Sequence, residues 1–415
     1  MIPRRKALTG SAFLLMLAAA FIDNLRGSLI PHLHDHLSLS FAVAGGMLLT
    51  VAGLSGAIFN SQLLVIEQRR GIRGLVFFSV GLAVLTALMA TQVRGAVTLG
   101  VMAIFLGGAI TSMGTISNLL LVLASENKKE FSDESTAAAT LDARSARRAK
   151  MMAGLHLMYG VGSLCAPAVA AFAMGRNFPW PWMFVLPLML VVGPVILTSK
   201  MDSGHSGSTP KTSPSGIPGG KKSQGMWHNI TPTEWLIVAI FLAYVAGEVL
   251  TSMWMPSFLI AHFGLSYKDA NQMSAGFFVV FSLARLAVLI FMRDKFHKPF
   301  IYVPLIITAL MMITATIFSR QGQNQSVLIF FFPAAGIIGP FFPMMLARVC
   351  TIYNKSWQRL TVVILTTMQI ALALSHLILG TVFDHLGAQR AYLIPPLLLL
   401  TAGIGAWGFL RKDAP

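Results

Sequence analysis

The chain has 415 residues, of which 55% are hydrophobic and only 11% are charged. Its mean hydropathy is +0.71, which excludes a soluble domain of this size because too much of the surface would be apolar. The net charge of +16, from 31 basic and 15 acidic residues, would point to nucleic acid in a soluble protein. Here the positions of the charges indicate a membrane topology instead, so we expect no nucleic-acid partner.

Twelve long apolar runs follow one another along the chain. An α-helix needs about 20 apolar residues to cross the hydrocarbon core of a bilayer, and these continuous runs lack the alternation of membrane β-strands. The expected spans are 7–33, 40–66, 72–92, 96–124, 148–173, 178–198, 233–262, 268–292, 298–320, 326–354, 357–383 and 389–411. The sequence therefore predicts an all-α membrane protein with twelve transmembrane helices.

A segment rich in Ser, Gly, Pro and Lys separates the sixth run from the seventh. Residues 199–232 lack the apolar surface that folding needs, so we expect a flexible cytoplasmic linker. It divides the chain into an N-terminal six-helix bundle at 1–198 and a C-terminal six-helix bundle at 233–415. Transporters often place their substrate site between two such bundles.

Basic residues gather in every second loop, as at 69–73, 128–150 and 221–222. Loops on the opposite side carry only scattered single ones, such as Arg94. The positive-inside rule therefore predicts that both termini are cytoplasmic, in a plasma membrane and most simply the inner membrane of a bacterium. We interpret residues 1–20 as part of an uncleaved first helix rather than a signal peptide, because its removal would break the six-plus-six pattern.

Only two acidic residues, Asp23 and Glu248, lie well inside predicted helices. Each precedes a proline by eight positions, Pro31 or Pro256, and this shared register favours duplicated halves. A charge at that depth costs at least ~2.5 kcal/mol, so something must compensate for it. We expect both acids to carry protons or to contact substrate in a water-filled cavity.

Ion pairing is the alternative for these acids. Asp23 has Arg26 on the same helix face, whereas Glu248 has no basic residue within a turn and is the stronger candidate. Arg26 could instead attract an anionic substrate. Arg285 lies towards the cytoplasmic end of its helix, where we expect it to brace neighbouring helix ends.

Other polar residues inside the predicted helices bind either neighbouring helices or substrate. They are Asn24, Asn118, His156, Tyr159, Gln369 and His376, and Tyr244 and Trp254 flank Glu248. We take all of them except His376 as candidate substrate contacts. We expect the first six, from Asn24 to His376, to be buried.

Histidines crowd the first external turn, where His32, His34 and His36 surround Asp35. Imidazoles with a carboxylate can bind zinc or copper, but no second cluster of ligands has a suitable spacing. We therefore predict no metal and no cofactor.

Glycines and prolines concentrate in the fourth and tenth spans, which hold equivalent positions in the two halves. They are Gly107, Gly108 and Gly114 in the fourth and Gly336, Gly339, Pro340 and Pro343 in the tenth. Small residues allow close packing, and interrupted backbone allows bending, so these spans could flex.

The segment from Gln68 to Arg73 resembles the cytoplasmic loop signature of the major facilitator superfamily, with Gln68 where an acid is usual. The resemblance implies gating or structural roles, in addition to Arg285, for Arg69, Arg70, Gly71, Arg73, Arg293 and Asp294.

Four further stretches resemble the fucose permease group of sugar–proton symporters. They are Asp23 to Pro31, Leu155 to Gly162 with Pro167, Tyr244 to Glu248 with Trp254 and Pro256, and Gly380-x-x-x-Asp384-x-x-Gly387. The acids of that group align here with Gly27 and Gly114, so a coupled proton would fall to Asp23 or Glu248.

The sequence thus predicts a secondary transporter that moves a small polar solute, preferably sugar-like, by alternating access and with protons. It would act as a monomer in the lipid bilayer on a small-molecule substrate. An organic anion transporter or a metabolite exporter is the alternative, and Arg26 favours it. A non-transporting receptor would be expected to carry a soluble output domain, and an enzyme is not expected because no spacing such as HExxH or GxSxG occurs.

Overall fold

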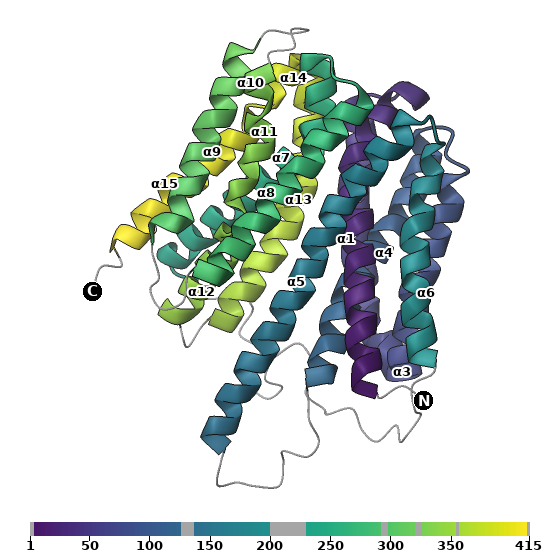
Figure 1. The fold of residues 1–415 in the computed structure, drawn as a ribbon, viewed down its shortest axis with the longest axis vertical. Helices are drawn as coiled ribbons and strands as arrows, with labels where there is room; N and C mark the ends of the chain where they lie inside the picture. The colour runs from purple at the N-terminus through teal and green to yellow at the C-terminus, as the bar shows by residue number, and fades with distance from the viewer. Residues whose placement is uncertain are drawn as a thin grey trace. The chain divides into compact units, whose positions relative to one another are not determined.

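A computed structural model describes residues 4–125, 137–199, 230–291, 298–319, 326–353 and 357–412. Within these ranges every regular element is a helix (Figure 1). Twelve helical segments among the described residues are long and apolar enough to cross a membrane. The prediction of an all-α integral membrane protein with twelve spans is therefore confirmed.

The described residues form two compact units, each assembled from several segments of the chain. Unit 1 comprises Met1–Leu25, Ser55–Ala166 and Phe178–Ser215, and unit 2 comprises Arg26–Leu54, Pro167–Asn177 and Gly216–Pro415. The bundles at 1–198 and 233–415 remain a prediction, and most of the linker at 199–232 lies outside the described residues.

Unit 1 is built from the first five long helices of the N-terminal half. They are α1 (Arg4–Leu37, up to Leu25), α3 (Ala52–Ala90), α4 (Ala96–Ser125), α5 (Ala137–Gly175, up to Ala166) and α6 (Val185–Ser199). Glycine lets α5 approach α1 closely, because a β-carbon at Gly162 would lie 2.5 Å from the carbonyl oxygen of Leu17. This contact aligns the polar residues of the two helices.

Among the described residues, unit 2 contains ten further α-helices and the C-terminal parts of α1 and α5. They are α2 (Phe41–Gly45), α7 (Pro232–Phe263), α8 (Tyr267–Phe291), α9 (Pro299–Phe318), α10 (Ser326–Ile329), α11 (Phe331–Ala334), α12 (Phe341–Ile352), α13 (Trp357–Leu386), α14 (Ala388–Ala391) and α15 (Ile394–Lys412). Helix α15 packs against α7 and α9 (Figure 1), and α13 packs against α7 and α2. Helix α7 is therefore central to the unit.

Local sequence signals explain where α7 begins and ends. Thr231 and Glu234 form a capping box at its start, and Pro232 occupies the first helical position, where no amide donor is needed. Gly264 ends the helix with a φ of 71°, a left-handed conformation that glycine adopts without strain. The predicted span at 233–262 agrees with these bounds.

Two predicted spans differ from the structure. Helical turns occupy most of the loop expected between the second and third spans, and the two helices that make up α3 meet at Gly71, whose backbone is not helical (φ 62°). The tenth span, expected as one helix at 326–354, is interrupted: a 3-10 turn (Ala335–Ile338) separates α11 from α12. Proline removes a backbone donor at Pro340 and Pro343, which prevents a continuous helical ladder.

Candidate functional site

The predicted residues Asp23, Asn24 and Tyr159 meet within unit 1. The hydroxyl of Tyr159 donates to Asp23 Oδ2 at 2.6 Å. The next residue, Asn24, donates from Nδ2 to Ser163 Oγ at 2.8 Å and to the Ala20 carbonyl at 2.9 Å. Adjacent residues of α1 thus bind residues one turn apart on α5. The Asn24 side chain is buried, whereas Asp23 and Tyr159 are half-buried.

Replacing Tyr159 with phenylalanine should lower the free energy of unfolding by about 1.5 kcal/mol, because the Asp23 carboxylate loses a charge-assisted hydrogen bond. Thermal unfolding of the purified variant in detergent measures this effect. Met158→Leu, one position away on α5, serves as the control, since its volume is nearly conserved. Equal unfolding temperatures for Tyr159→Phe and wild type would contradict the prediction.

Two predicted side chains, His156 and Gln369, are exposed, so the expectation that they are buried is wrong. Asn118 is half-buried and its Nδ2 donates to Gly114, one turn earlier on α4, at 2.9 Å. Substrate contact by these three residues remains a prediction.

Glu248 on α7 has two polar neighbours in unit 2. It is half-buried and lies within the electrostatic reach of both the Tyr244 hydroxyl and Arg285. Tyr244 precedes Glu248 by one turn of α7, whereas Arg285 comes from α8. The sequence identified all three residues, but not their association.

Tyr244 and Arg285 also bind the interrupted tenth span. Arg285 Nε donates to the Gly339 carbonyl at 2.9 Å, and the Tyr244 hydroxyl donates to the Ile338 carbonyl at 3.2 Å. The Gly339 carbonyl needs a side-chain donor because Pro343, four residues later, has no N–H. The guanidinium of Arg285 lies 4.1 Å from the centre of the Phe281 ring. Arg285 thus braces α8 against the break before α12.

A second polar group in unit 2 contains Trp254, His376 and Arg26. Trp254 Nε1 donates to His376 Nδ1 at 3.2 Å, and both side chains are buried. Since Nδ1 accepts, the ring proton of neutral His376 lies on Nε2. Arg26 donates to the Leu48 carbonyl at 3.3 Å and acts electrostatically on His376. The sequence signal for His376 was a polar residue in an apolar run, which alone does not reveal its partner.

Two glycines make room for the Trp254 indole. A β-carbon at Gly45 would lie 2.6 Å from two indole carbons, and one at Gly380 would lie 3.1 Å from the ring. Gly27 is similarly close to α7, since its β-carbon would lie 2.6 Å from the Met253 carbonyl oxygen. An acid in place of Gly27, as in the fucose permease group, would not fit here.

The residues of the loop signature differ in their surroundings. Arg73 Nε donates to the Thr198 carbonyl of α6 at 3.1 Å, while Arg69 and Arg70 are exposed and Gly71 forms the kink in α3. These positions suit a structural role for Arg73. The matching residues Arg293 and Asp294 lie outside the described residues.

Both ring nitrogens of His34 face protein oxygens. Nδ1 bonds the Leu39 carbonyl, and Nε2 lies 3.7 Å from Asp35 Oδ1. His32 stacks on His36 with ring centres 5.6 Å apart. In the part of the chain that the structure describes, no group of three His, Cys, Asp or Glu side chains has a geometry suited to a metal ion.

Comparisons with known proteins identify the fold. No family model matches the sequence, and no curated protein matches it. The crystal structure of a D-xylose–proton symporter is similar over 97% of both chains, with a TM-score of 0.72 and 13% identity.

Two further transporters are similar over their whole length. A bacterial homologue of the human lysosomal transporter Spinster, inward-facing and unoccupied, has a TM-score of 0.71 at 14% identity and 99% coverage of both chains. A nucleoside transporter has a TM-score of 0.66 at 13% identity, over 99% of this chain and 100% of the other. The chain therefore has the fold of these membrane transporters, which is the major facilitator fold that its sequence resembles.

Proposed function

We propose that the protein is a secondary active transporter, not an enzyme, that moves a small polar solute across the membrane by alternating access with protons. The observation that carries this proposal is the association of Glu248 with Tyr244 and Arg285 inside membrane-spanning helices of unit 2. The three solved structures compared above are transporters, and the D-xylose–proton symporter among them supports a sugar-like solute.

Tyr244 could transmit the protonation state of Glu248 to the tenth span. The hydroxyl carries a single proton, so it can donate either to the Ile338 carbonyl or to ionised Glu248, but not to both. When Glu248 is protonated, its own O–H can donate to Tyr244, which leaves the tyrosine proton on Ile338. When Glu248 is ionised, the tyrosine proton turns to it and the Ile338 carbonyl loses that donor. Proton binding would thereby bias the backbone at the break before α12.

Replacing Glu248 with glutamine should reduce solute-driven proton movement to the level of empty liposomes, because an amide cannot exchange the proton. Proteoliposomes that contain a pH-sensitive dye are exposed to a panel of sugars and organic acids. Glu67→Gln, a half-buried acid of α3, is the matched control and should retain the signal. Coupled transport by Glu248→Gln at the wild-type rate would remove Glu248 from the mechanism, and solute accumulation without any proton signal in wild type would refute coupling.

An organic anion is the second candidate substrate. Arg26 and the Nε2–H of His376 are both donors in one polar group, and donors suit carboxylate or phosphate oxygens. The same panel separates the two classes, because only this version predicts that organic acids produce the larger signal. Export of a metabolite would give proton movement of the opposite sign.

The remaining features of the proposal concern the whole molecule. We propose that bundles at 1–198 and 233–415 move about the linker at 199–232, in a bacterial inner membrane with both termini in the cytoplasm. The protein would act as a monomer and not as a receptor. The fold and the basic residues in every second loop support this arrangement.

A further inference from the structure

The turn between α1 and α2 is tied to the C-terminal half of the chain within unit 2. Helix α2 begins at Phe41 after the N-cap residue Ser40, whose hydroxyl accepts a hydrogen bond from the Val43 amide at 3.2 Å. The amides of Phe41 and Ala42 are the other early donors of the helix and need acceptors from elsewhere. One distant residue provides both.

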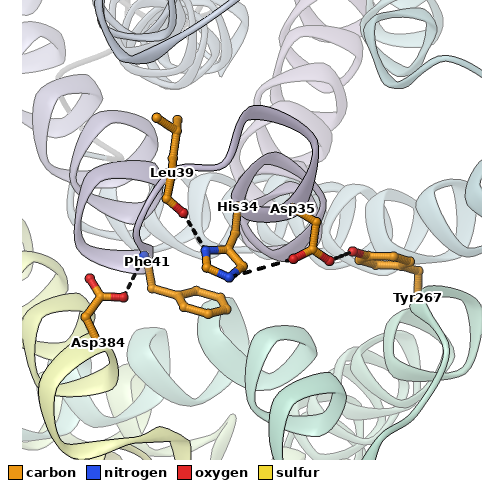
Figure 2. A network of polar contacts seen from close by, with 6 residues as sticks. All are labelled: His34, Asp35, Leu39, Phe41, Tyr267 and Asp384. Carbon is orange, nitrogen blue, oxygen red and sulfur yellow. Dashed lines mark hydrogen bonds and ion pairs between the residues drawn. The ribbon is translucent and has the colours of Figure 1, made fainter.

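That residue is Asp384, near the C-terminal end of α13. Its Oδ1 accepts from the Phe41 amide at 2.8 Å (Figure 2), and its Oδ2 accepts from the Ala42 amide at 2.7 Å. A carboxylate is favoured at a helix N-terminus by the partial positive charge of the free amides. Both oxygens of one side chain therefore hold the start of α2 against α13.

A second contact joins the end of α1 to the start of α8. The Tyr267 hydroxyl donates to Asp35 Oδ2, while Asp35 Oδ1 faces His34 (Figure 2). The His34 ring stacks on Phe41 with centres 3.9 Å apart, and Phe41 lies 4.3 Å from Phe383. The two contacts thus meet at Phe41. The backbones of α2 and α13 are also close, since a β-carbon at Gly380 would lie 2.8 Å from the Ala42 Cα.

Exposure makes the Asp384 contact reversible. The side chains of Asp384, Asp35 and Ser40 are exposed, and they line an open pocket of about 450 Å³ with His34, Ser38 and Leu39. Water can replace either partner when the contact breaks, so opening leaves no donor or acceptor unsatisfied. By contrast, the Tyr392 hydroxyl that bonds the Thr251 carbonyl is fully buried and would lose its bond without replacement. The polar contacts of the turn are therefore suited to a junction that opens and closes.

We propose that Asp384 is a latch that holds α2 against α13, and that its release opens the protein on the side of the turn at 38–40 during transport. The charge pattern predicts that this side is extracellular. Only the last step, the opening of this side during transport, rests on the proposed function, because alternating access requires each side to open in turn. The latch itself is a conformational contact that can be measured without any solute.

The test measures the distance between spin labels at two exposed positions, His36 at the end of α1 and Leu386 at the end of α13. Both are replaced by cysteine, with Cys165 and Cys350 replaced by alanine. In this background Asp384→Asn should raise the longer-distance population about tenfold, because the amide has one acceptor oxygen and no charge. Asp269→Asn is the matched control and should leave the distances unchanged, since Asp269 binds Ser266 at the start of its own helix.

A second variant keeps the proposal testable if Asp384→Asn fails to fold. Gly380→Ala retains the carboxylate but forces α2 away from α13, and it should raise the same longer-distance population. An unchanged distance distribution in either folded variant would overturn the latch. If the distances respond but no panel solute drives transport, the latch stands and the proposed function fails. If transport occurs but the distances do not respond, the proposed function stands and the latch fails.

Discussion

Gly336→Ala is expected to lower the free energy of unfolding by about 2 kcal/mol or more, the range for an overpacked core. A β-carbon at this position would lie 2.3 Å from the Phe277 carbonyl oxygen and 2.7 Å from the Phe281 amide nitrogen. Both atoms belong to the backbone of α8, which cannot rotate away as a flexible side chain could. The 3-10 turn at Ala335–Ile338 must therefore separate from α8, and this would also strain the bonds from Tyr244 and Arg285 to the same turn.

Thermal unfolding in detergent measures this effect. Gly408→Ala on α15 is the control, because nothing lies within 4 Å of the added β-carbon, and alanine in a helix should leave stability unchanged or raise it slightly. A Gly336→Ala protein as stable as wild type would contradict the close backbone contact between α8 and the 3-10 turn.

Arg285→Gln should destabilise the protein by about 2 kcal/mol, the scale for loss of a hydrogen bond from a charged group, because the Gly339 carbonyl loses its donor. Glu248 would then lie inside the membrane-spanning part of unit 2 without its cationic neighbour. The double variant Glu248→Gln with Arg285→Gln should recover at least about 1 kcal/mol of that loss, because no uncompensated charge remains.

The four proteins of this double-mutant cycle are compared by their unfolding temperatures under one set of detergent conditions. Arg176→Gln is a matched control, since Arg176 also lies over a phenylalanine ring, Phe172, at 4.4 Å. That arginine is exposed, so its loss should cost less than about 0.5 kcal/mol. Strictly additive effects of the two substitutions would show that Glu248 and Arg285 do not interact.

The twelve spans were predictable from the sequence because a helix that crosses lipid must be long and apolar, so each span is visible as a long apolar run. Its failures have a common cause. His156 and Gln369 were expected to be buried, yet they are exposed. In a soluble helix the apolar stripe marks the buried face. In a membrane helix the lipid-facing and core-facing sides are both apolar, so the spacing of apolar residues does not identify the buried face.

The candidate site was predictable as a set of residues but not as contacts. Asp23 and Glu248 are recognisable as rare acids within apolar helices, and a proline such as Pro343 signals a missing donor. Their partners come from distant segments: Tyr159 is 136 positions from Asp23, and Arg285 belongs to a different helix from Glu248. Only tertiary packing determines which donor reaches which acceptor.

The indole of Trp254 occupies volume that two absent side chains leave at Gly45 and Gly380. These three positions come from α7, α2 and α13, and they share one fixed space. No single one of them can grow unless another shrinks at the same time. A smaller residue at 254 is therefore expected to let Gly45 vary during evolution, whereas Gly380 stays constrained by the Ala42 Cα, 2.8 Å from its β-carbon position.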